Sequence, residues 1–247
     1  MLRRAVLFVT CIVDQIYPDI GFASAELLER QGVQVDVVPD VTCCAQMGFN
    51  AGYRDDSRAV AARTVELLQG CGDVVMPSGS CAAMIRHLYA ELFDGTRWAR
   101  EASDLAHRTY ELSEYLVDVL KVTDVGAHFD GRLTYHHACH GLRFLGLGPQ
   151  AALLLANVRG AEVVALPGSD ECCGFGGLFS VKHADVSEMM LSRKIASAEQ
   201  TGADVLVTGD ASCMTHMAGG LSRRGARLKV RHLAEILANR IERLAIR

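Results

Sequence analysis

Eight of the nine cysteines in this chain fall into two sets of four that repeat the same order and similar spacing. In each set a single cysteine precedes a neighbouring pair, and another single cysteine follows the pair. The intervals are 31 and 36 residues in the first set and 32 and 39 residues in the second. The first set comprises Cys11, Cys43, Cys44 and Cys81, and the second comprises Cys139, Cys172, Cys173 and Cys213.

Thiolates in sets of four point to metal binding. Neighbouring cysteines rarely form a useful disulfide, because the bond would cross-link almost no chain. Four soft thiolates instead suit an iron–sulfur cluster or zinc. We therefore expect the eight cysteines to be metal ligands, with two 4Fe–4S clusters as the first choice and zinc as an alternative in one half.

Glycines and small polar residues accompany the cysteines. Gly174, Gly176 and Gly177 follow the second pair, and we expect them to bind the cofactor by letting backbone N–H groups approach the sulfurs without a Cβ clash. The segments "PSGSC" at 77–81 and "GDASC" at 209–213 each place a capping turn before a predicted helix, whose N-terminus also favours negative charge.

Alternating strand and helix patterns place these residues at one edge of each of two sheets. Such alternation indicates parallel sheets with right-handed crossovers, so we predict an α/β fold of two pseudo-repeated Rossmann-like halves, residues 1–125 and 126–247. The cysteines then follow the carboxyl ends of consecutive strands, where open α/β sheets form ligand sites. Strands are predicted over 5–10, 33–39, 73–77, 132–138, 162–167, 204–209 and near 227–233. Helices are predicted over 18–30, 55–69, 81–93, 97–108, 111–121, 149–158, 184–200, from 213, and from the last strand to Arg247.

The composition is that of a globular protein. Half of the 247 residues are hydrophobic, and the net charge of −4 without a basic run argues against a nucleic-acid partner. No apolar stretch approaches the roughly 18 residues of a transmembrane helix. The apolar run after Arg4 ends at Asp14 with no signal-peptide cleavage site. We expect a cytoplasmic protein, in which cysteines serve metal binding or redox chemistry rather than disulfides.

The segments around the cysteines resemble the CCG cysteine-rich domain found in the cysteine-rich subunit of heterodisulfide reductase and in the iron–sulfur subunits of glycolate and anaerobic glycerol-3-phosphate dehydrogenases. Within that family the chain is most similar to the lactate utilisation protein A group. The segments that carry the resemblance are "FVTCIVD" (8–14), "CCAQMGFNAGY" (43–53), "PSGSCAAMIR" (77–86), "YHHACH" (135–140), "NVRGAEVVAL" (157–166), "ECCGFGGLFSVK" (171–182) and "HLAEIL" (232–237).

The resemblance implies an iron–sulfur oxidoreductase that acts as the electron-transfer subunit of a complex oxidising lactate to pyruvate. It also implies the partners, a ferredoxin-like iron–sulfur protein and a third, smaller subunit. The substrate of the complex would be a small 2-hydroxy acid. Lactate itself rests on the resemblance, since no feature of composition or spacing points to it.

Three departures from the family pattern bear on the cofactor. Ala45 stands where the family usually has glycine, so we expect the first loop to be less able to adopt a positive φ and regard it as the suspected zinc side. His137 stands where relatives often have another residue. Met84 and His216 occupy the places of an extra cysteine that supports a non-cubane cluster in heterodisulfide reductase. The last departure favours ordinary 4Fe–4S clusters, or zinc in one half.

Histidines near the second set have several interpretations. We expect His136, on the strand, to be a packed residue with a satisfied hydrogen bond. His140 follows Cys139 directly and is a weak candidate for a proton carrier or a hydrogen-bond donor to the metal centre. His216 lies one helical turn after Cys213, where an exposed or capping role is favoured over ligation.

Arg54 and Arg143 lie near the cysteine loops and are weak candidates for binding a substrate carboxylate, although surface salt bridges are the commoner fate of arginine. Cys71, outside both sets, is expected to be a small buried hydrophobe. Two alternative functions remain open at this point. One is a thiol–disulfide reductase of the heterodisulfide type, and the other is a zinc-bearing assembly module without redox activity.

Overall fold

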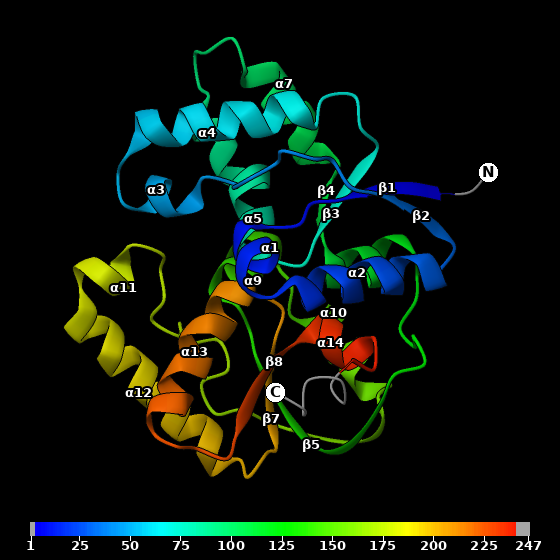
Figure 1. Ribbon diagram of the computed structural model, residues 1–247, viewed down its shortest axis with the longest axis vertical. Coiled ribbons are helices and arrows are strands. Elements are labelled where there is room, and N and C mark those ends of the chain that lie inside the picture. Colours follow the sequence, from blue (N-terminus) through cyan, green and yellow to red (C-terminus); the bar gives the residue numbers. More distant parts are fainter. Residues whose placement is uncertain (1–2, 241–247) are drawn as a thin grey trace.

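Two four-stranded parallel sheets with equivalent strand order form the framework of the molecule (Figure 1). The computed structural model describes residues 3–240. The first sheet has the order β2-β1-β3-β4 and the second β6-β5-β7-β8, so each half begins with a strand in an inner position. The strands are β1 (Arg3–Leu7), β2 (Val33–Asp36), β3 (Asp73–Met76), β4 (Thr109–Glu111), β5 (His128–His136), β6 (Arg159–Val164), β7 (Val205–Thr208) and β8 (Lys229–His232).

Helices connect the strands and cover the sheets. Those of the first half are α1 (Cys11–Ile16), α2 (Pro18–Arg30), α3 (Gln46–Asn50), α4 (Arg54–Leu67), α5 (Gly79–Ala83), α6 (Tyr89–Leu92), α7 (Ala99–His107) and α8 (Leu112–Glu114). Two π-helical turns, η1 (Met84–Leu88) and η2 (Tyr115–Val119), continue α5 and α8. Those of the second half are α9 (Cys139–Leu145), α10 (Pro149–Ala156), α11 (Phe179–Lys182), α12 (Ala184–Gln200), α13 (Ala211–Arg223) and α14 (Leu233–Leu237).

The predicted α/β fold with two Rossmann-like halves is confirmed, and the differences concern short elements. The sequence predicts helices over 97–108 and 111–121, whereas β4 lies between them and completes the first sheet. Three residues are too few to display a strand period, so periodicity alone missed it. At the C-terminus the structure has α14, and the predicted continuation over 241–247 lies outside the described residues.

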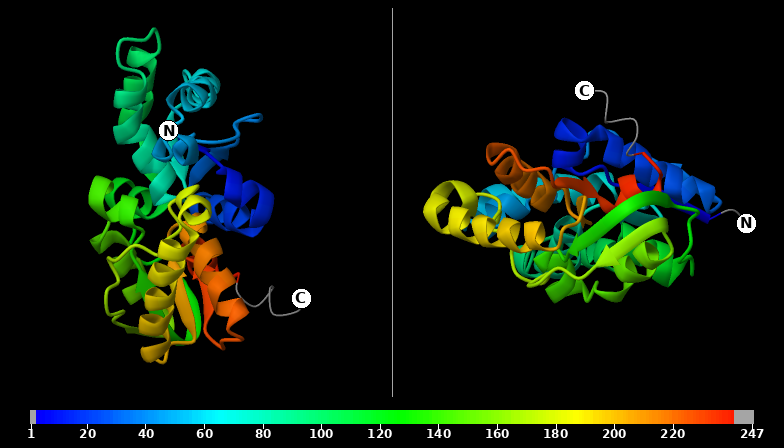
Figure 2. Two further views of the ribbon diagram at one scale, coloured as in Figure 1. Left: turned by 90° about the vertical axis from the view of Figure 1, so that its left-hand side faces the viewer. Right: turned by 90° about the horizontal axis from the view of Figure 1, so that it is seen from below.

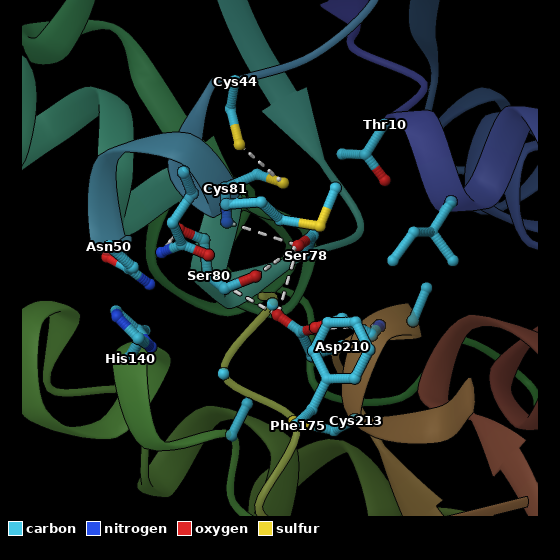
Figure 3. A pocket seen from close by; sticks show the side chains of 18 of the residues that line it. Thr10, Cys44, Asn50, Ser78, Ser80, Cys81, His140, Phe175, Asp210 and Cys213 are labelled. Atoms are coloured by element: carbon cyan, nitrogen blue, oxygen red, sulfur yellow. Dashed lines mark hydrogen bonds between the residues drawn. The ribbon is translucent and has the colours of Figure 1, made fainter. Parts of the chain in front are cut away.

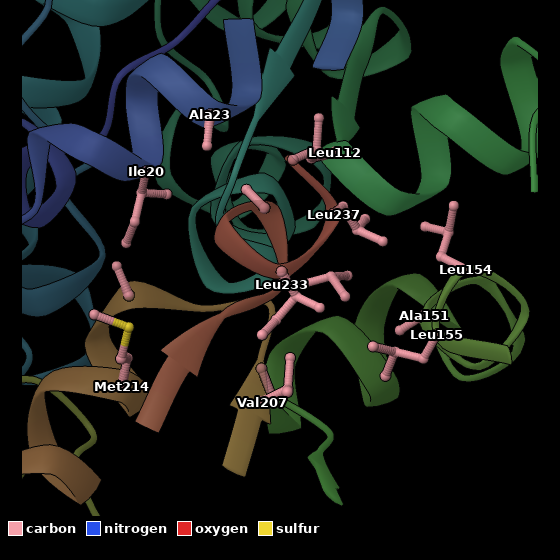
Figure 4. Close-up of a cluster of buried hydrophobic side chains, with 14 of the residues drawn as sticks. Ile20, Ala23, Leu112, Ala151, Leu154, Leu155, Val207, Met214, Leu233 and Leu237 are labelled. Carbon is pink, nitrogen blue, oxygen red and sulfur yellow. The ribbon is translucent and has the colours of Figure 1, made fainter. Parts of the chain in front are cut away.

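The two halves are stacked one above the other along the long axis of the molecule (Figures 1 and 2). Helix α2 of the first half packs on α14 of the second, and α10 of the second packs on α8 and η2 of the first. Ile20 and Ala23 of α2 meet Leu233 of α14 in one apolar core that draws residues from both halves (Figure 4). Burying these apolar faces stabilises the fold by about 25 cal/mol for each Å² of apolar surface removed from water. The boundary near residue 125 stays a prediction.

The carboxyl ends of the two sheets face the same central region. Helices α1, α5 and α9, which follow β1, β3 and β5, lie together in the middle of the molecule (Figure 1). An isolated antiparallel bridge joins Ser78, after β3, to Asp210, after β7. The fold thus places the loops that carry both cysteine sets at one interface.

Candidate metal centre

A single cavity between the halves is lined by all eight cysteines of the two sets. Figure 3 shows part of this lining, with Cys44, Cys81 and Cys213 labelled. In each half the first cysteine begins a helix after the first strand, the pair lies in the loop after the second strand, and the last lies in the helix after the third strand. All nine cysteines of the chain are free. The structure therefore brings together every residue expected to bind metal, while metal binding itself stays a prediction.

The thiols of the first set lie in mutual contact. The Sγ atoms of Cys44 and Cys81 are 3.2 Å apart, which is well outside the length of a disulfide bond. The thiols of Cys11 and Cys44 lie beside Cys43, and the backbone N–H of Ala45 donates to the Cys43 sulfur at 3.3 Å. These donors lower the pKa of Cys43 to about 3, with the Cys11 thiol the largest contributor. The set therefore offers one readily ionised sulfur surrounded by three more.

The second set repeats this arrangement. Cys139 and Cys173 donate toward Cys172, and the backbone N–H of Gly174 donates to its sulfur at 3.3 Å. The pKa of Cys172 lies far below its ordinary value, primarily because of the Cys139 thiol. Cys213 completes the set beside Cys173. Two four-thiol groups thus face one cavity, and in each of them a backbone N–H donates to the first sulfur of the pair.

Ala45 corrects one expectation. We expected alanine to hinder a positive φ in the first loop, yet Ala45 has φ +69° and matches Gly174, at φ +93°, in aiming its N–H at the first sulfur of the pair. A left-handed conformation costs an L-residue about 1–2 kcal/mol. The surrounding packing outweighs that cost, because Ala45 is buried in the core of the first half. The loop geometry alone gives no reason to assign zinc to this side.

Asp210 ties the two halves together beside the thiols (Figure 3). Its carboxylate caps α13 by accepting from the N–H of Ser212 at 3.1 Å, and it accepts from the N–H of Ser80 at 2.8 Å and the hydroxyl of Ser78 at 3.2 Å in the other half. Burial alone would raise the pKa of Asp210, but these hydrogen bonds outweigh it and the pKa is lowered. The sequence pattern "GDASC" predicted the cap and gave no sign of the bridge.

The histidines differ in their surroundings. His136 is fully buried as expected, but neither ring nitrogen has a hydrogen-bond partner among the described residues, so the expected satisfied bond is absent. Its pKa falls to about 3 because of burial. His140 lines the cavity, with Nδ1 3.5 Å from the Sγ of Cys139 and its ring stacked on Phe144. His216 contacts the hydroxyl of Ser187 through Nε2 at 3.2 Å.

The two arginines lie outside the cavity lining. Arg54 pairs with Glu91 at 2.9 Å and lies over the ring of Phe49, which is the surface role that arginine usually has. Arg143 is exposed on α9. Cys71, half-buried against the core of the first half, also lies away from the cavity. A substrate-binding role for either arginine has no support in these positions.

Residues of the second paired-cysteine loop form one wall of the cavity. Phe175, Gly176 and Gly177 line it, and a Cβ on Gly177 would lie 2.9 Å from Cγ of Met47 in the first half. Glycine at 177 therefore permits the loop to lie against α3. The buried Lys194 supports the same loop by donating to the carbonyl of Gly168. Sequence reasoning missed Lys194, because a lysine in an amphipathic helix ordinarily indicates an exposed face.

Comparison with known proteins agrees with this geometry. The family model described as "CCG: Cysteine-rich domain" matches residues 5–86 and 133–218, one match in each half. "Lactate utilization protein A" of Geobacillus sp. (strain WCH70) is 44% identical over 96% of this chain and 100% of its own length. The proteins of the same name from Geobacillus kaustophilus (strain HTA426) and Bacillus subtilis (strain 168) are 45% and 44% identical over 95% and 96% of this chain and 98% and 100% of their own lengths. Among solved structures, glutamate racemase isoform RacE1 of Bacillus anthracis aligns with 98% of this chain and 80% of its own at a TM-score of 0.36 and 10% identity, too low to support an inference.

Proposed function

This chain belongs to the CCG cysteine-rich domain family together with the lactate utilization protein A relatives, and we propose that it is the iron–sulfur, electron-transfer subunit of a complex that oxidises lactate to pyruvate. The observation that carries the proposal is the meeting of two four-thiol sets in one cavity. Lactate oxidation releases two electrons, and two metal centres in one cavity suit a route that passes electrons singly.

The residues of the cavity fit iron–sulfur clusters. Each set offers four soft sulfur donors, one of which ionises easily, as in Cys43 and Cys172. Each set also directs a backbone N–H, from Ala45 or Gly174, at a sulfur. Such N–H groups offset the negative charge that four thiolates would concentrate. The eight cysteines of the two sets would hold the clusters, with Gly176 and Gly177 in the surrounding loop.

Bound 4Fe–4S clusters would supply one-electron transfer at this cavity. The residues of the chain supply the surroundings. Ile12, Met47 and Phe175 give the cavity an apolar lining that limits water around the sulfurs. Asp210 fixes the N-termini of α5 and α13, which carry the last cysteine of each set. One carboxylate thereby links the two helices that carry these cysteines.

We propose a ferredoxin-like iron–sulfur protein and a third subunit as partners, lactate as the substrate of the complex, and the cytoplasm as its location. Within residues 3–240, no helix has the length and apolar character required to cross a bilayer. His140 remains the candidate for a proton carrier at the edge of the cavity, since it lies beside Cys139.

The same thiol sets are also suited to zinc, which prefers four sulfur or nitrogen ligands. A zinc-bearing assembly module would then be the function, with no redox activity. A thiol–disulfide reductase is the other alternative, and it requires turnover of a disulfide substrate. Metal content and lactate dependence distinguish these functions from the proposed one.

Growth on lactate tests the proposal in the complete complex. A strain that lacks this gene should fail to grow on L- or D-lactate as sole carbon source and should be rescued by the wild-type chain. Cys172→Ser should not rescue growth, because it removes one of the four sulfurs proposed to hold the second metal centre. The matched control, Cys71→Ser, changes a cysteine outside the cavity and should rescue growth fully. Equal rescue by both variants, at equal protein levels, would contradict the proposal.

A further inference from the structure

His136 has surroundings that its burial does not explain. It ends β5, three residues before Cys139, and its side chain is fully buried. Neither Nδ1 nor Nε2 has a hydrogen-bond partner among residues 3–240. A neutral imidazole carries one donor and one acceptor, and buried polar atoms are paired in the great majority of cases. A bound group that is not part of the chain would supply the partner that these ring nitrogens lack.

Thiols of the second set lie next to this ring. One nitrogen of His136 and the Sγ atoms of Cys173 and Cys213 all lie within 4.8 Å of one another, and all three side chains are buried. Metal–nitrogen and metal–sulfur bonds are about 2.0–2.1 and 2.3 Å long, so on one ion a nitrogen and a sulfur lie at most about 4.4 Å apart and two sulfurs at most about 4.6 Å apart. The three atoms are close to that spacing.

The described part of the first half, from residue 3 onward, has no such donor beside its cysteines. Phe8 lies three residues before Cys11, as His136 lies three residues before Cys139, and it is also buried. An aromatic hydrocarbon therefore fills the equivalent place without any unpaired polar atom. The two halves share fold, cysteine order and hydrogen-bond pattern, and at this position they differ in chemistry.

We propose that His136 is a nitrogen donor to the metal centre of the second cysteine set, which makes that centre a mixed sulfur–nitrogen site while the first set is all-thiolate. The inference rests on the proposed function only in taking the cysteines as metal ligands. Each iron of a 4Fe–4S cluster takes one protein ligand, so the imidazole would bind one iron in place of a thiolate of the second set and leave seven of the eight cysteines as ligands. Replacing a thiolate with neutral imidazole reduces the negative charge at a centre, and imidazole ligation accompanies higher reduction potentials in iron–sulfur proteins. The second centre would then have the higher reduction potential of the two.

Nitrogen coupling in the iron-loaded protein tests ligation directly. The full chain is labelled with ¹⁵N-histidine, reconstituted anaerobically with iron and sulfide, reduced, and examined by pulsed electron paramagnetic resonance. Wild type should display a ¹⁵N coupling, and His136→Phe, which copies the residue of the other half, should lose it. The matched control is His140→Phe, which removes the imidazole beside Cys139 and should retain the coupling. Absence of coupling in wild type, or its persistence in His136→Phe, would overturn the inference.

Cobalt binding separates this inference from the proposed function. Co²⁺ alone is titrated into the metal-free chain, and the absorption bands report sulfur and nitrogen ligands without requiring an iron–sulfur cluster. His136→Phe should shift the bands of one site and weaken Co²⁺ binding there by about tenfold or more. If these changes occur but no iron–sulfide cluster forms, the proposed function fails and the role of His136 stands. If clusters form and the cobalt spectra of wild type and His136→Phe are identical, the role of His136 fails.

Discussion

Exchanging alanine and glycine between the two paired-cysteine loops should affect the two halves unequally. Gly174 has φ +93°, and an added Cβ would lie 2.7 Å from the backbone oxygen of Ser187 and 3.0 Å from Cβ of Met190. Ala45 already holds the equivalent position with φ +69° and a buried methyl group. Gly174→Ala thus adds a side chain where backbone blocks it, whereas Ala45→Gly removes one that the structure accommodates.

The expected magnitudes follow from these contacts. Gly174→Ala incurs about 1–2 kcal/mol for the left-handed conformation and about 1–3 kcal/mol for overpacking, offset by up to about 1 kcal/mol from a less flexible unfolded chain. We expect a net loss of about 2–4 kcal/mol in the free energy of unfolding. Ala45→Gly relieves about 1 kcal/mol of backbone strain but loses a buried methyl and gains unfolded-state entropy. Its net effect should stay within about 1 kcal/mol of zero.

Urea unfolding of the metal-free chain under reducing, anaerobic conditions measures both variants, with helical circular dichroism as the signal. The same preparations, reconstituted with iron and sulfide, should show that Gly174→Ala retains less metal, because the N–H that lies 3.3 Å from the Sγ of Cys172 is displaced. Unfolding free energies of Gly174→Ala and wild type that agree within about 1 kcal/mol would refute the described loop conformation. Equal destabilisation by the two substitutions would refute the asserted difference between the loops.

Further predictions concern buried carboxyl groups. Asp210→Asn should lower the free energy of unfolding by about 2 kcal/mol at pH 7, because charged hydrogen bonds to both halves are lost. The pKa of Asp210 is lowered in the folded state, so its charge stabilises the fold only at pH values where it is ionised. The difference between Asp210→Asn and wild type in urea unfolding should therefore shrink as pH falls below about 4. Glu111 is fully buried, and burial raises its pKa from 4.5 to about 7, so the folded state keeps a proton that the unfolded chain releases. Glu111 should therefore lower the free energy of unfolding by about 3 kcal/mol in total as pH rises from about 4.5 to 7. Glu111→Gln should remove this pH dependence from the unfolding free energies measured across the range. An unchanged slope in Glu111→Gln would contradict this origin.

Local patterns predicted the framework because the elements that matter are long or distinctively marked. The strand before Cys11 ends in a buried apolar run, and the capping turns at 77–81 and 209–213 mark the starts of the helices that follow. The ordered repetition of the cysteines predicted their convergence, since parallel strands end at a common edge.

The features that the sequence did not predict depend on contacts between distant residues. The carboxylate of Asp210 and the N–H of Ser80 are 130 positions apart in the chain, and no local pattern reports such a bond. Ala45 adopts a positive φ because tertiary packing outweighs its preference. The unpaired nitrogens of His136 are likewise a property of the assembled interior, where local sequence favoured an ordinary hydrogen bond.

The most direct test of the account is the iron, acid-labile sulfide and zinc content of the chain purified without oxygen, together with its visible spectrum. We predict about eight iron and eight sulfide per chain, as two 4Fe–4S clusters require, with broad visible absorption that decreases on reduction. Stoichiometric zinc with neither iron nor visible absorption, unchanged after anaerobic reconstitution with iron and sulfide, would contradict the electron-transfer role.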